Sequence, residues 1–367
     1  MPSPKPAPLK SPLPQPALPP SQITPALAQA VAAEGLMQLF RMLTPEGRFI
    51  YAHAEGDPEA VLPGYNMLRH CGTLWFMLSA VNALNLPLLK TESRALAAGI
   101  SYAGARMKRP GWAPGLAIVT NGQIKLGGVG LALLMLSEYR EARAQAKANP
   151  ARVLAKASLP AALSATMAGL ADYALSQERP GQVADFHHKR ALTDGQDDGF
   201  HSDYYTGEAL FGLIAGGADP ARTAPLAEAL MQRGYGIDVQ SHWMAYAACA
   251  ACDHSLVPDD LGRAYLGQLL TAITTDTAYR ARCESTPIAC RSEALVRFLW
   301  LDRRHPGRFF APEQLALIHE TLTHNLALQL RWFQRGQFRK GDASDKVQID
   351  YIQHNAMAFL GWAMLHA

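Results

Sequence analysis

The chain has 367 residues, of which 49% are hydrophobic and 18% are charged, and its formal net charge at pH 7 is +3. This composition allows a large buried core and excludes a wholly disordered chain. The mild positive charge, without a dense Lys/Arg stripe, argues against nucleic acid as a partner. Because no apolar run reaches about 18 residues, we expect no transmembrane helix.

The first 22 residues are rich in proline and lack the apolar segment of a signal peptide. We expect residues 1–22 to form a disordered, polyproline-like leader and residues 23–367 to form a single domain. Such a leader favours a periplasmic or cell-envelope location only modestly, and the cytoplasm is the alternative.

Helical periodicity dominates the rest of the chain. It predicts twelve helices, at about 23–43, 66–84, 91–107, 127–145, 154–178, 205–216, 220–234, 238–253, 257–277, 289–303, 312–334 and 350–366. A short extended pair over 117–126, with Asn121-Gly122 as its turn, is expected between the third and fourth helices.

Six polar clusters recur along the chain, and each precedes or opens an apolar helical stretch. They are Asn66-x-x-Arg69-His70-x-Gly72, Lys125-x-Gly127-Gly128, Tyr204-Tyr205-x-Gly207-Glu208, Asp238-x-x-x-His242-Trp243, Arg291-x-Glu293 and Asp350-Tyr351-x-Gln353-His354. Because about one further helix separates successive clusters, they mark every second helix. We therefore predict an all-α fold, an (α/α)6 toroid of six helical hairpins, whose inner helices begin around one mouth.

This hairpin number and motif placement resemble the six-hairpin glycosidase superfamily over residues 23–367. That group includes glycoside hydrolases, polysaccharide lyases and sugar epimerases. The resemblance is one of architecture, and no single catalytic signature fixes the reaction. It implies a carbohydrate substrate bound at the mouth of the toroid.

A pair of carboxyl groups is the first candidate for catalysis. Glycoside hydrolysis needs one protonated carboxyl group and one carboxylate on either side of the scissile bond. Glu208 and Asp238 are the leading pair, and Asp350 could replace either of them. The structural alternative is a role at a helix N-terminus, as a cap for Asp238 and Asp350 and beside the helix dipole for Glu208.

Three cations are candidates for binding acidic groups of a substrate. Arg69, Lys125 and Arg291 belong to the clusters, and the N-termini of the inner helices would add positive potential. An anionic poly- or oligosaccharide is therefore the expected substrate. Alternatively, these cations neutralise acidic side chains within the core.

His70 and Tyr205 suit a different reaction. A polysaccharide lyase or uronate C5-epimerase removes the proton beside a carboxylate, with His or Tyr as acid or base. Asn66, Arg69 and His70 lie at i, i+3 and i+4, so that one helix face could present all three. The structural alternative for His70 is a hydrogen-bonded network between helices.

The remaining polar residues of the clusters are candidates for substrate binding. Trp243 could stack on a sugar ring, although a tryptophan in a helical protein is more often part of the core. The other members are His242, Glu293, Tyr351, Gln353 and His354.

Neither a metal nor a cofactor is expected. Cys249 and Cys252 are predicted to be buried thiols, because they lack the further Cys or His ligands of a zinc site. Cys283 and Cys290 flank a loop that a disulfide could close, which would indicate an oxidising compartment; a bridge and two free thiols both stay open.

Taken together, these patterns favour a carbohydrate-active enzyme that hydrolyses glycosidic bonds. Lyase or epimerase chemistry through His70 and Tyr205 is the closest alternative. A toroid that binds a glycan or an envelope partner without catalysis is the third.

Overall fold

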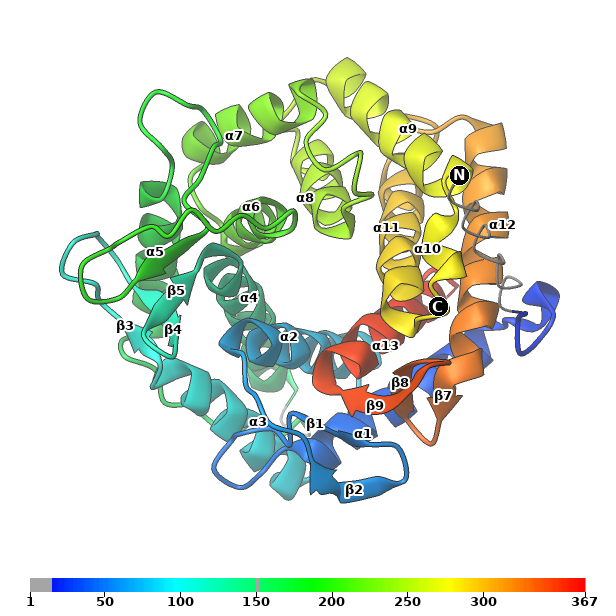
Figure 1. Ribbon diagram of the computed structural model, residues 1–367, viewed down its shortest axis with the longest axis horizontal. Helices are drawn as coiled ribbons and strands as arrows, with labels where there is room; N and C mark the ends of the chain where they lie inside the picture. Colours follow the sequence, from blue (N-terminus) through cyan, green and yellow to red (C-terminus); the bar gives the residue numbers. More distant parts are fainter. Residues whose placement is uncertain (1–14, 150–151, 367) are drawn as a thin grey trace, which may run out of the picture.

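The computed structural model describes residues 15–149 and 152–366, and its long helices form two concentric rings (Figure 1). Each inner helix packs against the next one, and the last packs against the first, so the ring is closed. The inner ring consists of α2 (Met67–Ala83), α4 (Leu126–Ala148), α6 (Tyr205–Gly216), α8 (His242–Asp253), α11 (Ser285–Arg304) and α13 (Ile349–Met364). The outer ring consists of α1 (Pro25–Met42), α3 (Lys90–Gly104), α5 (Leu163–Ser176), α7 (Pro220–Gln232), α9 (Asp259–Thr275) and α12 (Pro312–Gln329). The predicted (α/α)6 toroid is therefore confirmed.

All twelve predicted helices occur, and the largest error lies at the start of α5. The helix α5 begins at Leu163 instead of near 154, because Pro160 disfavours helical backbone for the residue before it and cannot donate a backbone hydrogen bond. The helix α8 begins at His242, where the Ser241 side chain accepts a hydrogen bond from the Met244 backbone N–H. A short helix, α10 (Ala278–Ala281), was not predicted.

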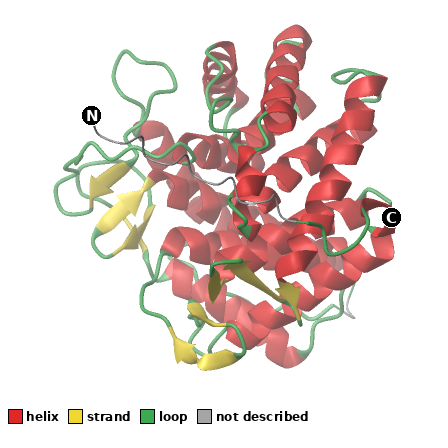
Figure 2. Cartoon of the chain, turned by 45° about the vertical axis from the view of Figure 1, so that its right-hand side comes forward, coloured by secondary structure: helices red, strands yellow, loops and turns green. Residues whose placement is uncertain are grey.

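Two small antiparallel sheets lie at the edge of the toroid (Figure 2). One has the order β3-β4-β5-β6 and contains the predicted hairpin, whose turn residues Asn121 and Gly122 both have positive φ. Its strands are β3 (Met107–Lys108), β4 (Ala117–Thr120), β5 (Gln123–Lys125) and β6 (Lys189–Ala191).

The second sheet, which the sequence did not predict, has the order β2-β1-β9-β8-β7 and pairs segments that lie almost 300 residues apart. It consists of β1 (Ala52–Ala54), β2 (Asp57–Val61), β7 (Phe333–Gln334), β8 (Gln337–Gly341) and β9 (Ser344–Gln348). The strand β9 leads directly into α13, as β5 leads into α4. The sheets therefore help to fix where these two inner helices begin.

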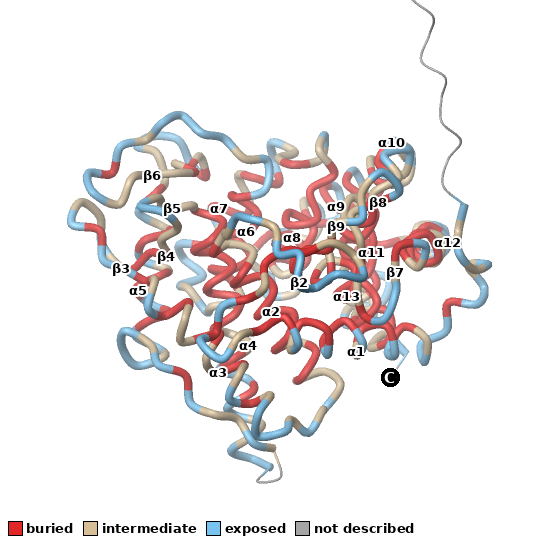
Figure 3. Tube along the Cα trace, turned by 60° about the horizontal axis from the view of Figure 1, so that its bottom comes forward, coloured by how far each residue is buried: buried red, intermediate tan, exposed pale blue. Residues whose placement is uncertain are grey.

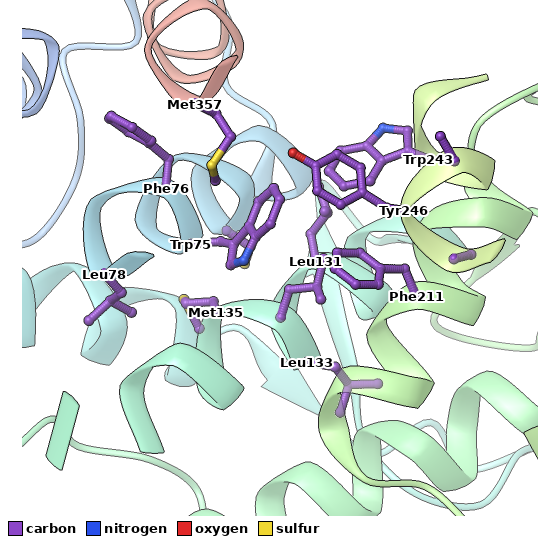
Figure 4. Close-up of a cluster of buried hydrophobic side chains, with 14 of the residues drawn as sticks. Trp75, Phe76, Leu78, Leu131, Leu133, Met135, Phe211, Trp243, Tyr246 and Met357 are labelled. Atoms are coloured by element: carbon purple, nitrogen blue, oxygen red, sulfur yellow. The ribbon is translucent and has the colours of Figure 1, made fainter. Parts of the chain in front are cut away.

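Aromatic side chains from the inner helices fill the centre of the ring (Figure 4). The ring centroids of Trp75 and Trp243 are 5.7 Å apart, and those of Phe211 and Tyr246 are 5.0 Å apart. The inner helices are mostly buried, whereas the outer helices and the loops carry the exposed positions (Figure 3). The aromatic cluster forms a solid centre beneath the helix starts.

Three further predictions concern the N-terminal leader, the cysteines and membrane-spanning helices. The predicted disordered leader falls largely on residues 1–14, which lie outside the described residues; Ala17 donates a backbone hydrogen bond to Ala327 of α12. All five cysteines are free, so Cys283 and Cys290 are not bridged. Among the described helices, none is long and apolar enough to cross a membrane.

Candidate functional site

A cavity of about 470 Å³ opens where the inner helices begin. Side chains from α2, α6, α8, α11 and α13 line it, together with the end of β8 and the loop before α6. The cavity contains eleven of the residues predicted from the sequence: Asn66, Arg69, Tyr205, Glu208, His242, Trp243, Arg291, Asp350, Tyr351, Gln353 and His354. Five of the six predicted clusters thus contribute polar groups to one mouth, whereas the Lys125 cluster does not line the cavity.

Asp238 does not belong to this cavity. It is exposed in the turn before α8 and lines a separate hollow with His201, Asp203 and Arg233. Asp238 was predicted to lie at the start of a helix, but α8 begins four residues later at His242. The structure therefore does not bring Glu208 and Asp238 together as a pair.

His70 also lies outside the cavity. It is buried, and its two ring nitrogens are hydrogen-bonded to the Tyr65 hydroxyl at 2.7 Å and the Gly99 carbonyl at 3.0 Å. Burial lowers the pKa of His70 to about 4. Arg69, the next residue, lines the cavity, so the predicted shared face of the helix does not form, and His70 holds α2 against α3.

Glu208 lies in the first turn of α6 and is fully buried at the edge of the cavity. Its Oε2 atom has no hydrogen-bond partner among the described residues. Burial raises the pKa of Glu208 to about 8, although the Arg69 charge opposes this shift. At neutral pH the carboxyl group is therefore protonated and can donate a hydrogen bond to a substrate oxygen.

Arg69 and Asp350 form an ion pair across the cavity wall. The Arg69 Nε atom lies 2.8 Å from the Asp350 Oδ2 atom, and Arg69 Nη1 donates to the Tyr51 hydroxyl at 2.9 Å. Gln348 Nε2 donates to the other carboxylate oxygen of Asp350. The pair joins the first inner helix, α2, to the last, α13.

His354 is held by a buried carboxylate. Its Nδ1 atom lies 2.7 Å from Glu293 Oε1, and Glu293 Oε2 accepts a hydrogen bond from the Tyr246 hydroxyl at 2.6 Å. Burial alone would lower the pKa of His354, but the Glu293 carboxylate outweighs burial and raises it. Glu293 does not line the cavity and orients the histidine from behind.

His242 has the opposite environment. Its imidazole ring lies 5.2 Å from that of His354, and its Nε2 atom is buried without a hydrogen-bond partner in the described part of the chain. Burial lowers the pKa of His242 well below its usual value, and the charges of His354 and Arg291 lower it further. One cavity thus contains an imidazole that stays neutral and another that favours the protonated form.

The other predicted cations occupy two different positions. Arg291 lines the cavity and donates to Gln240 Oε1 at 2.9 Å and to the Val239 carbonyl at 3.1 Å. Lys125 lies beside the mouth, at the end of β5, but does not line the cavity. Burial and the neighbouring charges of Lys189 and Arg69 lower the pKa of Lys125.

Three charged groups and one thiol that line the cavity were not predicted from the sequence as site residues: Arg282, Glu284, Lys340 and Cys290. The first three come from the α10–α11 connection and from β8, neither of which was predicted. Cys290 was considered only as a disulfide partner. Gln353 is a predicted binding residue that lines the cavity, and its Nε2 atom lies 3.4 Å from His354 Nδ1.

Within the described residues, one group could coordinate a metal ion. His242, Cys290, Glu293 and His354 each offer a ligand atom within 4.8 Å of the others. The two oxygens of Glu293, however, already contact His354 and Tyr246, and burial raises the pKa of the Cys290 thiol. The hydrogen bonds present suit an arrangement that holds a proton on His354.

Comparisons with known proteins identify the architecture. No protein-family model matches the chain, and no curated protein matches it in sequence. A crystal structure of D-mannose isomerase matches with a TM-score of 0.63 and 11% identity, covering 95% of this chain and 99% of that chain. A sugar epimerase from a ruminal bacterium matches with a TM-score of 0.55 and 10% identity, covering 92% and 98%. The α-1,6-mannanase GH76A of Salegentibacter sp. HEL1_6 has a TM-score of 0.42 and 11% identity, covering 92% and 99%.

The chain is thus an (α/α)6 toroid with the architecture of the six-hairpin glycosidase superfamily. At 10–11% identity these similarities establish the fold alone. The reaction has to be inferred from the residues at the mouth.

Proposed function

We propose that this protein is a sugar isomerase or epimerase that moves a proton on the carbon next to a carbonyl group. The observation that carries the proposal is the pair of histidines whose environments shift their pKa values in opposite directions. Two titratable groups with opposite shifts in one cavity are typical of an acid and a base that act on the same substrate.

In this mechanism neutral His242 is the base. Its Nε2 atom takes the proton from C2 of an open-chain aldose, and the electrons of the C–H bond form the C1=C2 bond of an enediol. His354, protonated and held by Glu293, donates a proton to the carbonyl oxygen. Return of the proton from His242 to C1, with transfer of the O2 proton to His354, gives a ketose. Return of a proton to the opposite face of C2, with transfer of the O1 proton back to His354, gives the epimer.

The other groups of the cavity suit the binding of sugar hydroxyls. Protonated Glu208 can donate a hydrogen bond, while Tyr351 and Gln353 add further donors and acceptors. Trp243 lines the cavity as a flat apolar surface for the carbon skeleton. The cavity volume of about 470 Å³ suits a mono- or disaccharide better than a long polysaccharide.

Two further points support this choice. Two solved structures that match with TM-scores above 0.5 are described as a D-mannose isomerase and a sugar epimerase. The site also departs from the lyase or epimerase mechanism predicted through His70, because that residue is buried between helices.

The test is turnover of a panel of aldoses and ketoses, followed by NMR of the products. We expect His242→Asn and His354→Asn each to lower kcat at least 100-fold, because each removes a proton-transfer group. His70→Asn is the matched control. If its fold is retained, it should keep a kcat within about threefold, since His70 does not reach the cavity.

If the His242→Asn and His354→Asn variants both keep the activity of the wild type, the proposal is contradicted. A chelator provides a second control. Proton transfer by the histidine pair predicts unchanged activity after treatment with EDTA, whereas a loss restored by a divalent cation would indicate that the His242–His354 group holds a metal.

Hydrolysis of a glycosidic bond is the second candidate, because two carboxyl groups line the same cavity. Glu208 is protonated at neutral pH, and Asp350 is held beside Arg69. Glu208 would then be the general acid and Asp350 the base, in place of the predicted Asp238. New reducing ends from an oligosaccharide, lost in Glu208→Gln, would favour hydrolysis over isomerisation. Glycan binding without turnover would favour a purely binding toroid, and the cell-envelope location stays a prediction.

A further inference from the structure

We infer that the substrate carries a negatively charged group, such as a carboxylate or a phosphate, which binds to a cluster of cations on one side of the cavity. This inference rests on the proposed sugar-binding function and names the substrate class. The cation cluster consists of Arg282, Arg291 and Lys340.

The side chains that line the cavity carry an excess of positive charge. Apart from His354, whose charge is balanced by Glu293 behind it, four of them are cations: Arg69, Arg282, Arg291 and Lys340. Three carry carboxyl groups, namely Glu208, Glu284 and Asp350, but Glu208 is protonated at neutral pH. Four cations against two carboxylates leave a formal excess of +2, and a cavity focuses such a potential on its ligand.

The excess lies mainly on the side formed by the α10–α11 connection and β8. Glu284 pairs with both Arg282, at 2.8 Å, and Lys340, at 3.1 Å. One carboxylate therefore holds two cations close together and neutralises only one of their charges. An anionic substrate group would complete this arrangement.

Arg291 provides a third charge in the same region. Its guanidinium donates to Gln240 Oε1 and to the carbonyls of Val239 and Pro287. These contacts fix its position without neutralising it, and no ion pair of Arg291 with a carboxylate occurs among the described residues. Arg291 lies on α11, the helix that also carries Glu293, and Glu293 orients His354.

Two further lysines, Lys125 and Lys346, lie beside the mouth and interact with its charged groups. Burial lowers the pKa of Lys346, and the charges of Arg69 and Lys340 lower it further, against the effect of Asp350. Lys125 responds in the same way to Lys189 and Arg69. Positive charge therefore extends from the cavity to its entrance, where it would attract an anionic sugar.

The test compares neutral and anionic sugars of the same stereochemistry. D-Mannose is paired with D-mannuronate and D-mannose 6-phosphate, and D-glucose with D-glucuronate and D-glucose 6-phosphate. Both binding, by calorimetry, and interconversion, by NMR, are measured at low salt. We expect at least one anionic member to bind at least tenfold more tightly than its neutral counterpart, with an affinity that falls as salt is added.

The double variant Arg282→Gln/Lys340→Gln removes two exposed cations of the cluster. We expect it to raise KM for the anionic sugar about tenfold or more, with kcat within threefold and with no change for the neutral sugar. Arg304→Gln is the matched control, because Arg304 is also exposed and ion-paired, to Asp253 at 2.6 Å, but lies at the other end of α11. It should leave both sugars unaffected.

The outcomes separate this inference from the proposed function. Neutral sugars that are bound as tightly as their anionic counterparts, or a double variant that affects both equally, would overturn the charged-substrate inference even if isomerisation is observed. Tight, cation-dependent binding of an anionic sugar without any isomerisation would uphold the inference and overturn the isomerase proposal. If none of the anionic sugars binds, the inference is overturned.

Discussion

At the scale of single residues, the cavity contains three titratable groups: Glu208 and His242 favour the neutral form, and His354 favours the charged form. Glu208 is buried without a partner for Oε2, so its neutral form is favoured. His354 has a buried carboxylate partner and favours the charged form, whereas His242 has none and stays neutral. Burial opposes charge at all three positions, and only the presence of Glu293 reverses its effect.

The Glu208→Gln variant tests the raised pKa of Glu208 through the pH dependence of stability. The unfolded carboxyl group ionises near its usual pKa of 4.5, whereas the folded one ionises near 8. Between these values the folded state binds more protons, so wild-type stability falls as pH rises, by up to about 1.4 kcal/mol per pH unit. We expect the Tm of Glu208→Gln to exceed that of the wild type increasingly from pH 5 to pH 8; a constant difference would contradict the raised pKa.

The same variant also tests the reaction. If Glu208 only donates a hydrogen bond to the sugar, its glutamine replacement still can, so isomerisation should fall less than tenfold. Wild-type activity should decline above about pH 8, where Glu208 ionises, and the variant should lack this part of the decline while keeping the loss that follows deprotonation of His354. A loss of more than 1,000-fold would instead identify Glu208 as a proton donor in hydrolysis.

Many site residues could be predicted because they belong to the clusters at helix starts. Arg69, Glu208, His242 and His354 were all named from that pattern, although the two histidines were assigned only to substrate binding. Their roles depend on Glu293 and on burial, which residue spacing does not encode. Lys340 could not be found because β8 was not predicted, and the bridge between Glu284 and Gly341 brings this strand to the mouth.

At the scale of elements, two glycines of α4 set its close approach to α6. A Cβ atom on Gly127 would overlap the Glu208 carboxyl group and lie 2.7 Å from Tyr205 Cδ1, whereas one on Gly130 would overlap the Glu208 backbone carbonyl. The first contact involves mainly side chains of the cavity, and the second involves the helix backbone. The two glycines therefore serve the site and the packing, respectively.

Alanine substitutions should distinguish these roles. Gly127→Ala should lower activity at least tenfold by displacing Glu208, with a smaller loss of stability than Gly130→Ala, which should destabilise the protein by about 3 kcal/mol through forced helix separation. Gly267→Ala on α9 is the control, because its Cβ would meet only Gln314 at 3.7 Å and helix propensity favours alanine. Thermal unfolding and kcat measure both effects; equal stability losses for Gly127→Ala and Gly130→Ala would contradict this division.

The elements themselves were largely predictable from periodicity, because the inner helices are apolar and the loops contain proline and glycine. The errors have local causes. Pro160 delays α5, and the turn before α8, with positive φ at Gly234, Gly236 and Gln240, moves Asp238 away from the cavity. Apart from the β4–β5 hairpin, the strands of the small sheets escaped prediction because they are only two to five residues long.

At the scale of the whole molecule, closure of the ring brings the first and last inner helices, α2 and α13, into one site. The helix α13 packs against both α1 and α2, and the Arg69–Asp350 ion pair spans this junction. A Cβ on Gly35 would lie 2.9 Å from the Ala356 Cβ, so α1 and α13 are already in close contact there.

Gly35→Leu should therefore destabilise the entire toroid, by about 2–3 kcal/mol, because the larger side chain forces the first and last helices apart. Ala30→Leu, on an exposed position of the same helix, should change stability by less than 1 kcal/mol. Urea unfolding followed by circular dichroism and by tryptophan fluorescence should give one coincident transition for the wild type and for both variants. Two separate transitions would contradict the prediction that residues 23–367 form a single domain.

The central claim is that the histidine pair transfers a proton on the carbon beside a sugar carbonyl group. The most direct measurement is incubation of the wild-type protein with the sugar panel in D2O, followed by NMR at C1 and C2. We predict that interconverted sugars gain solvent deuterium at one of these carbons, and that His242→Asn abolishes the gain. Products that carry no deuterium there, or new reducing ends in place of isomers, would contradict the account.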